Sequence, residues 1–151
     1  MKKLLLFVAV VFVAIQVEAQ AVKKGDVPDI VVQNLESWYP GVSKVKWEMN
    51  DGMYVASFLI SKMENEVVIS SDGEFSSSEA EINLDQLPEA VRNYLSEHFP
   101  DMTFEEIEME MDARGLVKYS VEAGNMEYEF SADGKLLSQE SDDDDQEDDK
   151  D

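Results

Sequence analysis

The chain has 151 residues, no cysteine and a formal net charge of −22 at pH 7. Such an acidic protein repels the phosphates of nucleic acids and of anionic lipids, so nucleic-acid binding and a membrane partner for the mature chain are excluded. Cations or basic proteins are favoured as binding partners instead. Without cysteine there is no disulfide and no lipid anchor on an N-terminal cysteine, so packing alone must hold the fold together.

Residues 1–19 have the layout of a secretory signal peptide. Lys2 and Lys3 give a basic start, residues 4–15 form a short apolar run, and small residues surround a cleavage point after Ala19. The run is too short to cross a membrane, although an uncleaved N-terminal anchor is the alternative. We therefore expect export, with the mature protein in the periplasm.

Two helices are predicted at a fixed spacing. The first follows Pro28 and ends before Pro40, and the second follows Pro88 and ends before Pro100, so both prolines recur 60 residues later. Apolar residues at helical spacing give each helix one buried stripe. These stripes are Val27, Val31 and Leu35 in the first helix and Leu87, Val91 and Leu95 in the second.

The residues after each helix alternate between apolar and polar, which is the pattern of strands that bury one face. Glycine-bearing turns separate the runs, and the alternation places four aromatic residues on the core face. The turns are Asn50-Asp51-Gly52, Asp72-Gly73, Gly124-Asn125 and Asp133-Gly134, and the aromatic residues are Trp47, Tyr54, Tyr119 and Tyr128.

The predicted fold class is α+β. A tandem repeat of two helix-plus-four-strand units, at about 24–82 and 84–140, is expected to form one antiparallel sheet of eight strands with both helices on one face. Residues 20–140 then make one domain. Residues 141–151 hold eight carboxylates and one lysine, and we expect them to be a disordered acidic tail.

This arrangement resembles the PepSY-like domain. The shared features are Val27-Pro28 and Leu87-Pro88 at the helix starts, a strand bearing Trp47, and turns of the form D-G-x-Y and D-G-x-F. The resemblance covers about residues 24–140 and implies a fold akin to the β-lactamase-inhibitor protein, as found in small exported proteins of Bacteroidetes. It also implies a relation to inhibitory or propeptide-like modules, most of which have no established activity.

The sequence argues against an enzyme. His98 is the only histidine, cysteine is absent, and no G-x-S-x-G nucleophile motif occurs. A single histidine also cannot build a histidine-rich zinc site. We expect His98 to be a helix-end residue that caps backbone carbonyls, and no cofactor is certain.

The sheet face opposite the helices is the candidate binding surface. In the second unit it is expected to carry Glu106, Glu108, Glu110, Lys118, Glu122, Glu127 and Glu129. In the first unit it is expected to be mixed, with Lys44, Lys46, Val55, Ser57, Leu59 and Val68. Two interpretations stay open here: a solvated face of an acidic protein, or a contact surface for a basic protein, a peptide or a cation.

Two further features of the chain have two interpretations each. Trp38 and Tyr39, at the end of the first helix, either cover the edge of the core or form the rim of a binding surface. The tail carboxylates Asp142, Asp143, Asp144 and Asp145 either keep the chain in solution or gather Ca²⁺ weakly, since hard oxygen ligands suit that ion. The sequence thus predicts a non-catalytic periplasmic binding module, an inhibitor or regulator of another protein. A calcium-binding or calcium-regulated protein is the alternative.

Overall fold

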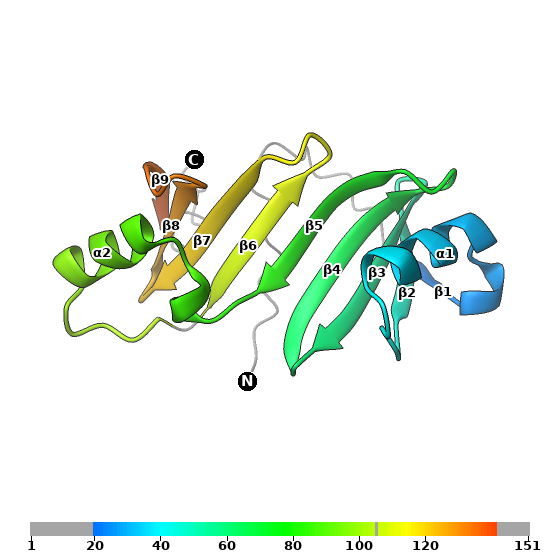
Figure 1. Cartoon of the computed structure of the whole chain (residues 1–151), viewed down its shortest axis with the longest axis horizontal. Coiled ribbons are helices and arrows are strands. Elements are labelled where there is room, and N and C mark those ends of the chain that lie inside the picture. Colours follow the sequence, from blue (N-terminus) through cyan, green and yellow to red (C-terminus); the bar gives the residue numbers. More distant parts are fainter. Residues whose placement is uncertain (1–19, 105, 142–151) are drawn as a thin grey trace, which may run out of the picture.

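The structure, a computed structural model, describes residues 20–104 and 106–141. The predicted signal peptide and most of the predicted tail, including Asp142 to Asp145, lie outside these residues. The described chain forms one antiparallel sheet in which the strands lie side by side in their order along the chain (Figure 1). The strands are β1 Gln20–Val22, β2 Lys46–Asn50, β3 Met53–Ile60, β4 Met63–Ser70, β5 Phe75–Glu81, β6 Ile107–Asp112, β7 Val117–Ala123, β8 Met126–Ser131 and β9 Leu136–Ser141.

Both helices pack on the same face of this sheet, one near each end (Figure 1). They are α1 Asp29–Trp38 and α2 Glu89–His98, each preceded by a 3-10 turn, at Lys24–Asp26 and Leu84–Gln86. The α+β class and the antiparallel sheet are therefore confirmed. Each helix has ten residues, a length that is marginal for an isolated helix in water, so both depend on the sheet for their stability.

The hydrophobic core is divided between the two ends of the sheet. In the first half, Val31 and Leu35 of α1 are at most 1% exposed and pack on the apolar face of β2, β3 and β4. In the second half, Val91 and Leu95 of α2 pack in the same way on β6, β7 and β8. The helix stripes predicted from apolar spacing are thus confirmed, and three of the four core-face aromatics, Trp47, Tyr54 and Tyr128, are buried. Tyr119 is half-buried.

The sheet has one strand more than predicted. The three residues of β1 pair antiparallel with β2, so that Ala21 lies opposite Glu48. Three residues are too few to show a convincing alternation, which is why the sequence did not reveal this strand. The predicted hairpin at Asp51 and Gly52 does connect β2 to β3.

Two further hairpins are closed by Asp-Gly turns that lie directly under the helices. Gly73 accepts a hydrogen bond of 2.9 Å through its carbonyl oxygen from the side-chain amide of Asn34 in α1. Gly134 lies against Ala90 and the backbone of Val91 in α2. Both glycines have positive φ angles, 90° and 83°, and a Cβ atom on either would strike the helix above it. Each helix therefore seats on a turn as well as on the strands.

We expect Gly134→Ala to destabilise the fold by about 2–4 kcal/mol. The added Cβ would overlap Ala90, an overpacking cost of about 1–3 kcal/mol, and alanine is strained at this φ by about 1 kcal/mol more. Urea unfolding followed by circular dichroism measures the loss. Gly124→Ala is the matched control, because its φ is 71° and nothing lies within 4 Å of its added Cβ. Equal losses in both variants would show that helix seating contributes nothing.

Candidate functional site

The face of the sheet opposite the helices, here called the open face, carries rows of charged side chains that cross the strands. The antiparallel register places these residues side by side. One row runs through Lys46, Ser57, Glu66, Glu79, Glu110 and Lys118. A neighbouring row runs through Glu81, Glu108, Ser120, Glu129 and Ser138.

Carboxylates from both halves meet where the two rows cross the middle of the sheet. We call Glu66, Glu79, Glu106, Glu108 and Glu110 the central carboxylate cluster; these residues come from β4, β5, β6 and the residue before β6. Glu79 faces Glu66 on one side and Glu110 on the other. Like charges directly opposite each other on neighbouring strands are destabilising, so this arrangement costs the fold stability.

The cluster perturbs the acidity of its members. Burial, followed by the charge and hydrogen bond of Glu79, raises the pKa of Glu108 to about 9. Burial and the surrounding carboxylates also raise the pKa of Glu79, although the hydrogen bond from Glu108 opposes that shift. At neutral pH Glu108 therefore stays protonated and donates a hydrogen bond to Glu79, so the pair shares that proton.

Two other members of the cluster also have a raised pKa. Burial raises the pKa of Glu110, while the nearby Lys118 ammonium acts against the shift. Partial burial of its carboxyl and the Glu48 carboxylate raise the pKa of Glu66, although Glu66 as a residue is exposed and solvent screens it.

The flanks of the open face hold the other predicted residues. Lys118 pairs with Glu129 at 3.4 Å, and the Glu129 carboxylate also accepts a hydrogen bond of 2.8 Å from Ser138. Glu122 lies opposite Glu127. Glu127 is only 8% exposed, so it presents little surface to a partner despite its place on this face.

Several open-face carboxylates were missed from the sequence. They are Glu48, Glu64, Glu66, Glu79 and Glu81 of the first half. Glu64 and Glu66 could have been predicted from the sequence, because they alternate with the buried residues Val67 and Ile69. Glu79 and Glu81 were hidden by a register shift after the turn at Gly73. Strict alternation from Phe75 would send them to the core, and the bulge moves them to the open face.

The remaining predicted residues lie elsewhere. Trp38 and Tyr39 do not border the open face, because they lie at the end of α1 on the opposite side of the sheet, where Trp38 meets Phe75 edge-on at 5.7 Å. Tyr39 packs on Phe58, so covering the edge of the core explains both residues better than a rim of the open face. Lys44 precedes β2 and lies outside the strands.

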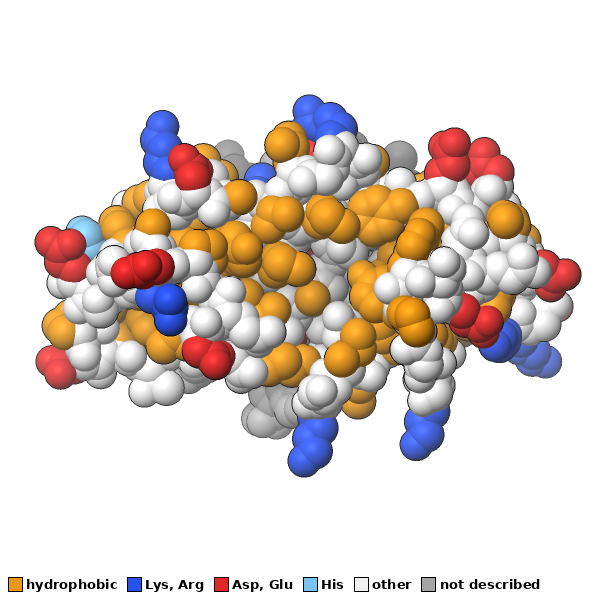
Figure 2. All heavy atoms as spheres, viewed as in Figure 1, with side chains coloured by type: hydrophobic (Ala, Val, Ile, Leu, Met, Phe, Trp, Pro, Cys, Tyr) orange, Lys and Arg blue, Asp and Glu red, His pale blue; other side chains and the backbone are white. Residues whose placement is uncertain are grey.

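The helix face has a different character. Between α1 and α2, apolar side chains gather over the central strands and charged side chains lie at the periphery (Figure 2). The register assigns Ala80, Met109, Met111 and Tyr119 to this side, and all four are half-buried. We call them the apolar saddle. The sequence did not predict it, because the alternation assigns these residues to the core face. The two helices leave that part of the core face partly uncovered.

Within residues 20–104 and 106–141, no group of three or more histidines or carboxylates is arranged to hold a metal ion. The histidine of α2 stacks on Tyr94 with 3.9 Å between ring centres, and its Nδ1 lies 2.9 Å from the Tyr94 carbonyl oxygen. His98 thus has the helix-end contacts expected of it. Neither described helix has the length and apolar character needed to cross a membrane.

Residues 52–138 match the PepSY-like family, described as "Putative beta-lactamase-inhibitor-like, PepSY-like". This match spans more than half of the sequence, and the chain belongs to that family. It matches none of the curated proteins with which it was compared.

Solved structures from Bacteroides share the fold. A "putative periplasmic" protein of Bacteroides eggerthii is similar with a TM-score of 0.64 and 24% identity, over 76% of this chain and 88% of that one. A DUF2874 family protein of Bacteroides ovatus gives 0.64 and 20%, over 78% and 89%. A BLIP-like protein of Bacteroides fragilis gives 0.61 and 23%, over 82% and 90%. These are likenesses of fold.

The shared proton of Glu79 and Glu108 predicts that stability falls as pH rises. In the unfolded chain Glu108 ionises near its ordinary pKa of 4.5, whereas in the fold its pKa is about 9. Between these values the folded state binds more protons, so the free energy of unfolding decreases with increasing pH. Glu108→Gln should therefore stabilise the protein at pH 8.5 by about 1–3 kcal/mol and help little near pH 5.

Urea unfolding at pH 5, 7 and 8.5 measures this. Glu64→Gln is the control, because it makes the same substitution at an exposed position on the open face. A wild-type pH dependence that survives unchanged in Glu108→Gln would contradict the shared proton.

Proposed function

We propose that this protein is a non-catalytic binding module of the periplasm that captures a basic protein or peptide on its open face and so inhibits or regulates it. The observation that carries the proposal is the central carboxylate cluster. It extends across both halves of the sheet, and it holds a pair of glutamates in which one stays protonated at neutral pH. A lysine or arginine of a partner can take the place of that proton.

The energetics support this assignment. Crowded, partly desolvated carboxylates are costly in the free protein, and a cationic partner group relieves both the repulsion and the raised pKa. The net charge of −22 also accelerates the approach of a basic partner, an effect that weakens as salt increases. Binding should therefore tighten from pH 6 to pH 8 as the shared proton becomes easier to displace.

The family and its structural neighbours support the same proposal. The family description includes "beta-lactamase-inhibitor-like", and one neighbour is called BLIP-like, which agrees with a role in binding another protein. A periplasmic location is supported by the description of the Bacteroides eggerthii protein and by the signal-like residues 1–19.

Reversing charge beside Glu79 should abolish capture without harming the fold. In Glu66→Lys with Glu110→Lys, a cation lies on each side of Glu79, which offsets the new repulsion between position 110 and Lys118, so the sheet should stay folded. Bead-bound wild type should retain a stoichiometric partner from a periplasmic extract of the bacterium that makes it. We expect the double variant to bind that partner at least tenfold more weakly by calorimetry.

Two controls separate this surface from the alternatives. Glu89→Lys with Glu97→Lys changes the net charge equally on exposed positions of α2 and should keep most of the affinity. Met111→Asp alters the apolar saddle. If Met111→Asp alone abolishes capture, the binding surface is the saddle, and if the α2 variant weakens binding as much as the β4–β6 variant, only net charge matters. Either result rejects the open face.

The calcium alternative has its own test. Within the described chain no residues form a metal site, so this alternative depends on the tail at Asp142 to Asp145. If the tail gathers Ca²⁺ in the folded protein and so stabilises it, millimolar Ca²⁺ should raise the melting temperature of residues 20–151 more than that of residues 20–140. Equal shifts in the two proteins, read by calorimetry, would reject the tail as a calcium site.

A further inference from the structure

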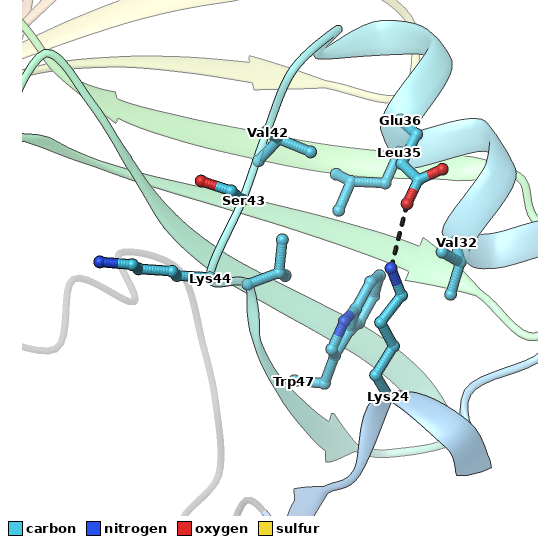
Figure 3. A pocket seen from close by; sticks show the side chains of 9 residues that line it. Lys24, Val32, Leu35, Glu36, Val42, Ser43, Lys44 and Trp47 are labelled. Carbon is cyan, nitrogen blue, oxygen red and sulfur yellow. Dashed lines mark hydrogen bonds and ion pairs between the residues drawn. The ribbon is translucent and has the colours of Figure 1, made fainter.

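A small hollow opens on the helix side of the first half, away from the open face. It lies between α1, the segment that leads into β2, and the 3-10 turn at residues 24–26 (Figure 3). Its volume is about 180 Å³. Its walls are the apolar side chains of Val32, Leu35, Val42 and Val45, and Trp47 lines it as well. An apolar cavity of about 150 Å³ in another protein accommodates benzene, so this hollow can hold a ring of that size.

Trp47 gives the hollow one polar feature. The residue is 3% exposed, and its indole Nε1 atom is buried without a hydrogen-bond acceptor among the described residues. Buried N–H groups are almost always paired, and a buried tryptophan usually finds an acceptor for its nitrogen. The indole lies within the hollow, beside Lys24 (Figure 3). This N–H is unpaired but buried in the wall of the hollow, so the side chains that cover it must shift before the acceptor of a guest molecule can reach it.

The mouth of the hollow is crossed by an ion pair. Lys24 Nζ lies 3.1 Å from Glu36 Oε1, and the two side chains are 67% and 52% exposed (Figure 3). Exposed pairs of this kind contribute little stability, so this one opens readily to admit a guest. Because the two charges neutralise each other, the mouth favours neither a cationic nor an anionic ligand.

The backbone at the wall is held in an unusual conformation. Lys44 has a φ of 57°, a left-handed value that a residue with a side chain adopts only at a cost. Its ammonium group points away from the hollow (Figure 3). The strained residue thus shapes the wall through its backbone and does not place a charge inside.

The second half lacks these features at the positions 60 residues later. Trp47 corresponds to Ile107, which has no hydrogen-bond donor on its side chain, and Lys44 corresponds to Phe104, which packs against the second core. Phe104 is not among the residues with positive φ. A core of this design therefore needs neither a buried indole N–H nor a strained lysine, so both are particular to the first half.

We propose that this hollow is a binding site for a small uncharged molecule with an apolar body and one hydrogen-bond acceptor, such as a ketone or an amide. The acceptor pairs with Trp47 Nε1–H, and the body fills the space between Val32, Leu35 and Val42. The site is independent of the open face, because it lies on the other side of the sheet. Its test succeeds or fails separately from the capture of a basic partner.

Cyclohexanone is the probe, and the indole N–H signals of ¹⁵N-labelled protein report its binding. The chain has two tryptophans, Trp47 and Trp38, and Trp38 is an internal reference because it is 40% exposed at the end of α1. We expect the Trp47 signal to move saturably at millimolar cyclohexanone and the Trp38 signal to stay in place. Toluene, an apolar ring of similar size, should bind roughly three- to tenfold more weakly, because it cannot accept the hydrogen bond.

Two variants test the two halves of the proposal, with the methyl signals of Val32 and Leu35 as the readout. Trp47→Phe keeps a ring but removes the donor, so the preference for cyclohexanone over toluene should disappear. Val42→Phe fills the space and should abolish binding of both. The proposal is overturned if the Trp47 signal does not saturate, if both tryptophans shift alike, or if Trp47→Phe keeps the preference.

Discussion

The docking of two short helices on one face of a single sheet is the constraint on which the rest of the structure depends. Neither helix is long enough to persist alone, and no disulfide supports them. Each is therefore held by a valine and a leucine buried in the sheet and by an Asp-Gly turn that leaves room beneath it. Because both helices use the same face, the opposite face is released from any part in the core.

That release explains the difference between the two faces. A residue of the open face need only be compatible with a strand, so the face can carry charges that a core could not. The central carboxylate cluster is more than charge that a strand tolerates, because it is costly. Burial and mutual repulsion raise the pKa of Glu108 and Glu79. A face that served only to be solvated would gain nothing from placing glutamates opposite one another across the middle strands.

Much of the fold could be read from periodicity, and the errors have local causes. The helix stripes at Val31 and Leu35 and the turn at Gly73 followed from spacing and turn chemistry. The central carboxylate cluster could not be read in this way, because the bulge after that turn moves Glu79 and Glu81 from the core face to the open face. Trp47 was assigned to the core, which is correct for its ring, but no pattern of residues could show that its nitrogen lacks an acceptor among the described residues. A sequence pattern predicts which face of the sheet a side chain lies on. Whether an atom is unpaired or a proton is shared depends on distances between atoms, which the sequence does not give.

The order of the strands has a consequence for how the chain folds. Since each strand pairs with its neighbours in the sequence, most contacts are local, and local contacts favour rapid folding. Two pairings are different, because each spans a helix: β1 with β2 across α1, and β5 with β6 across α2, which also joins the halves. Closing these longer loops costs more entropy, so we expect both pairings to form late. Glutamates of β5 and β6 face each other where the halves join, so their charge repulsion should slow this pairing when they are ionised.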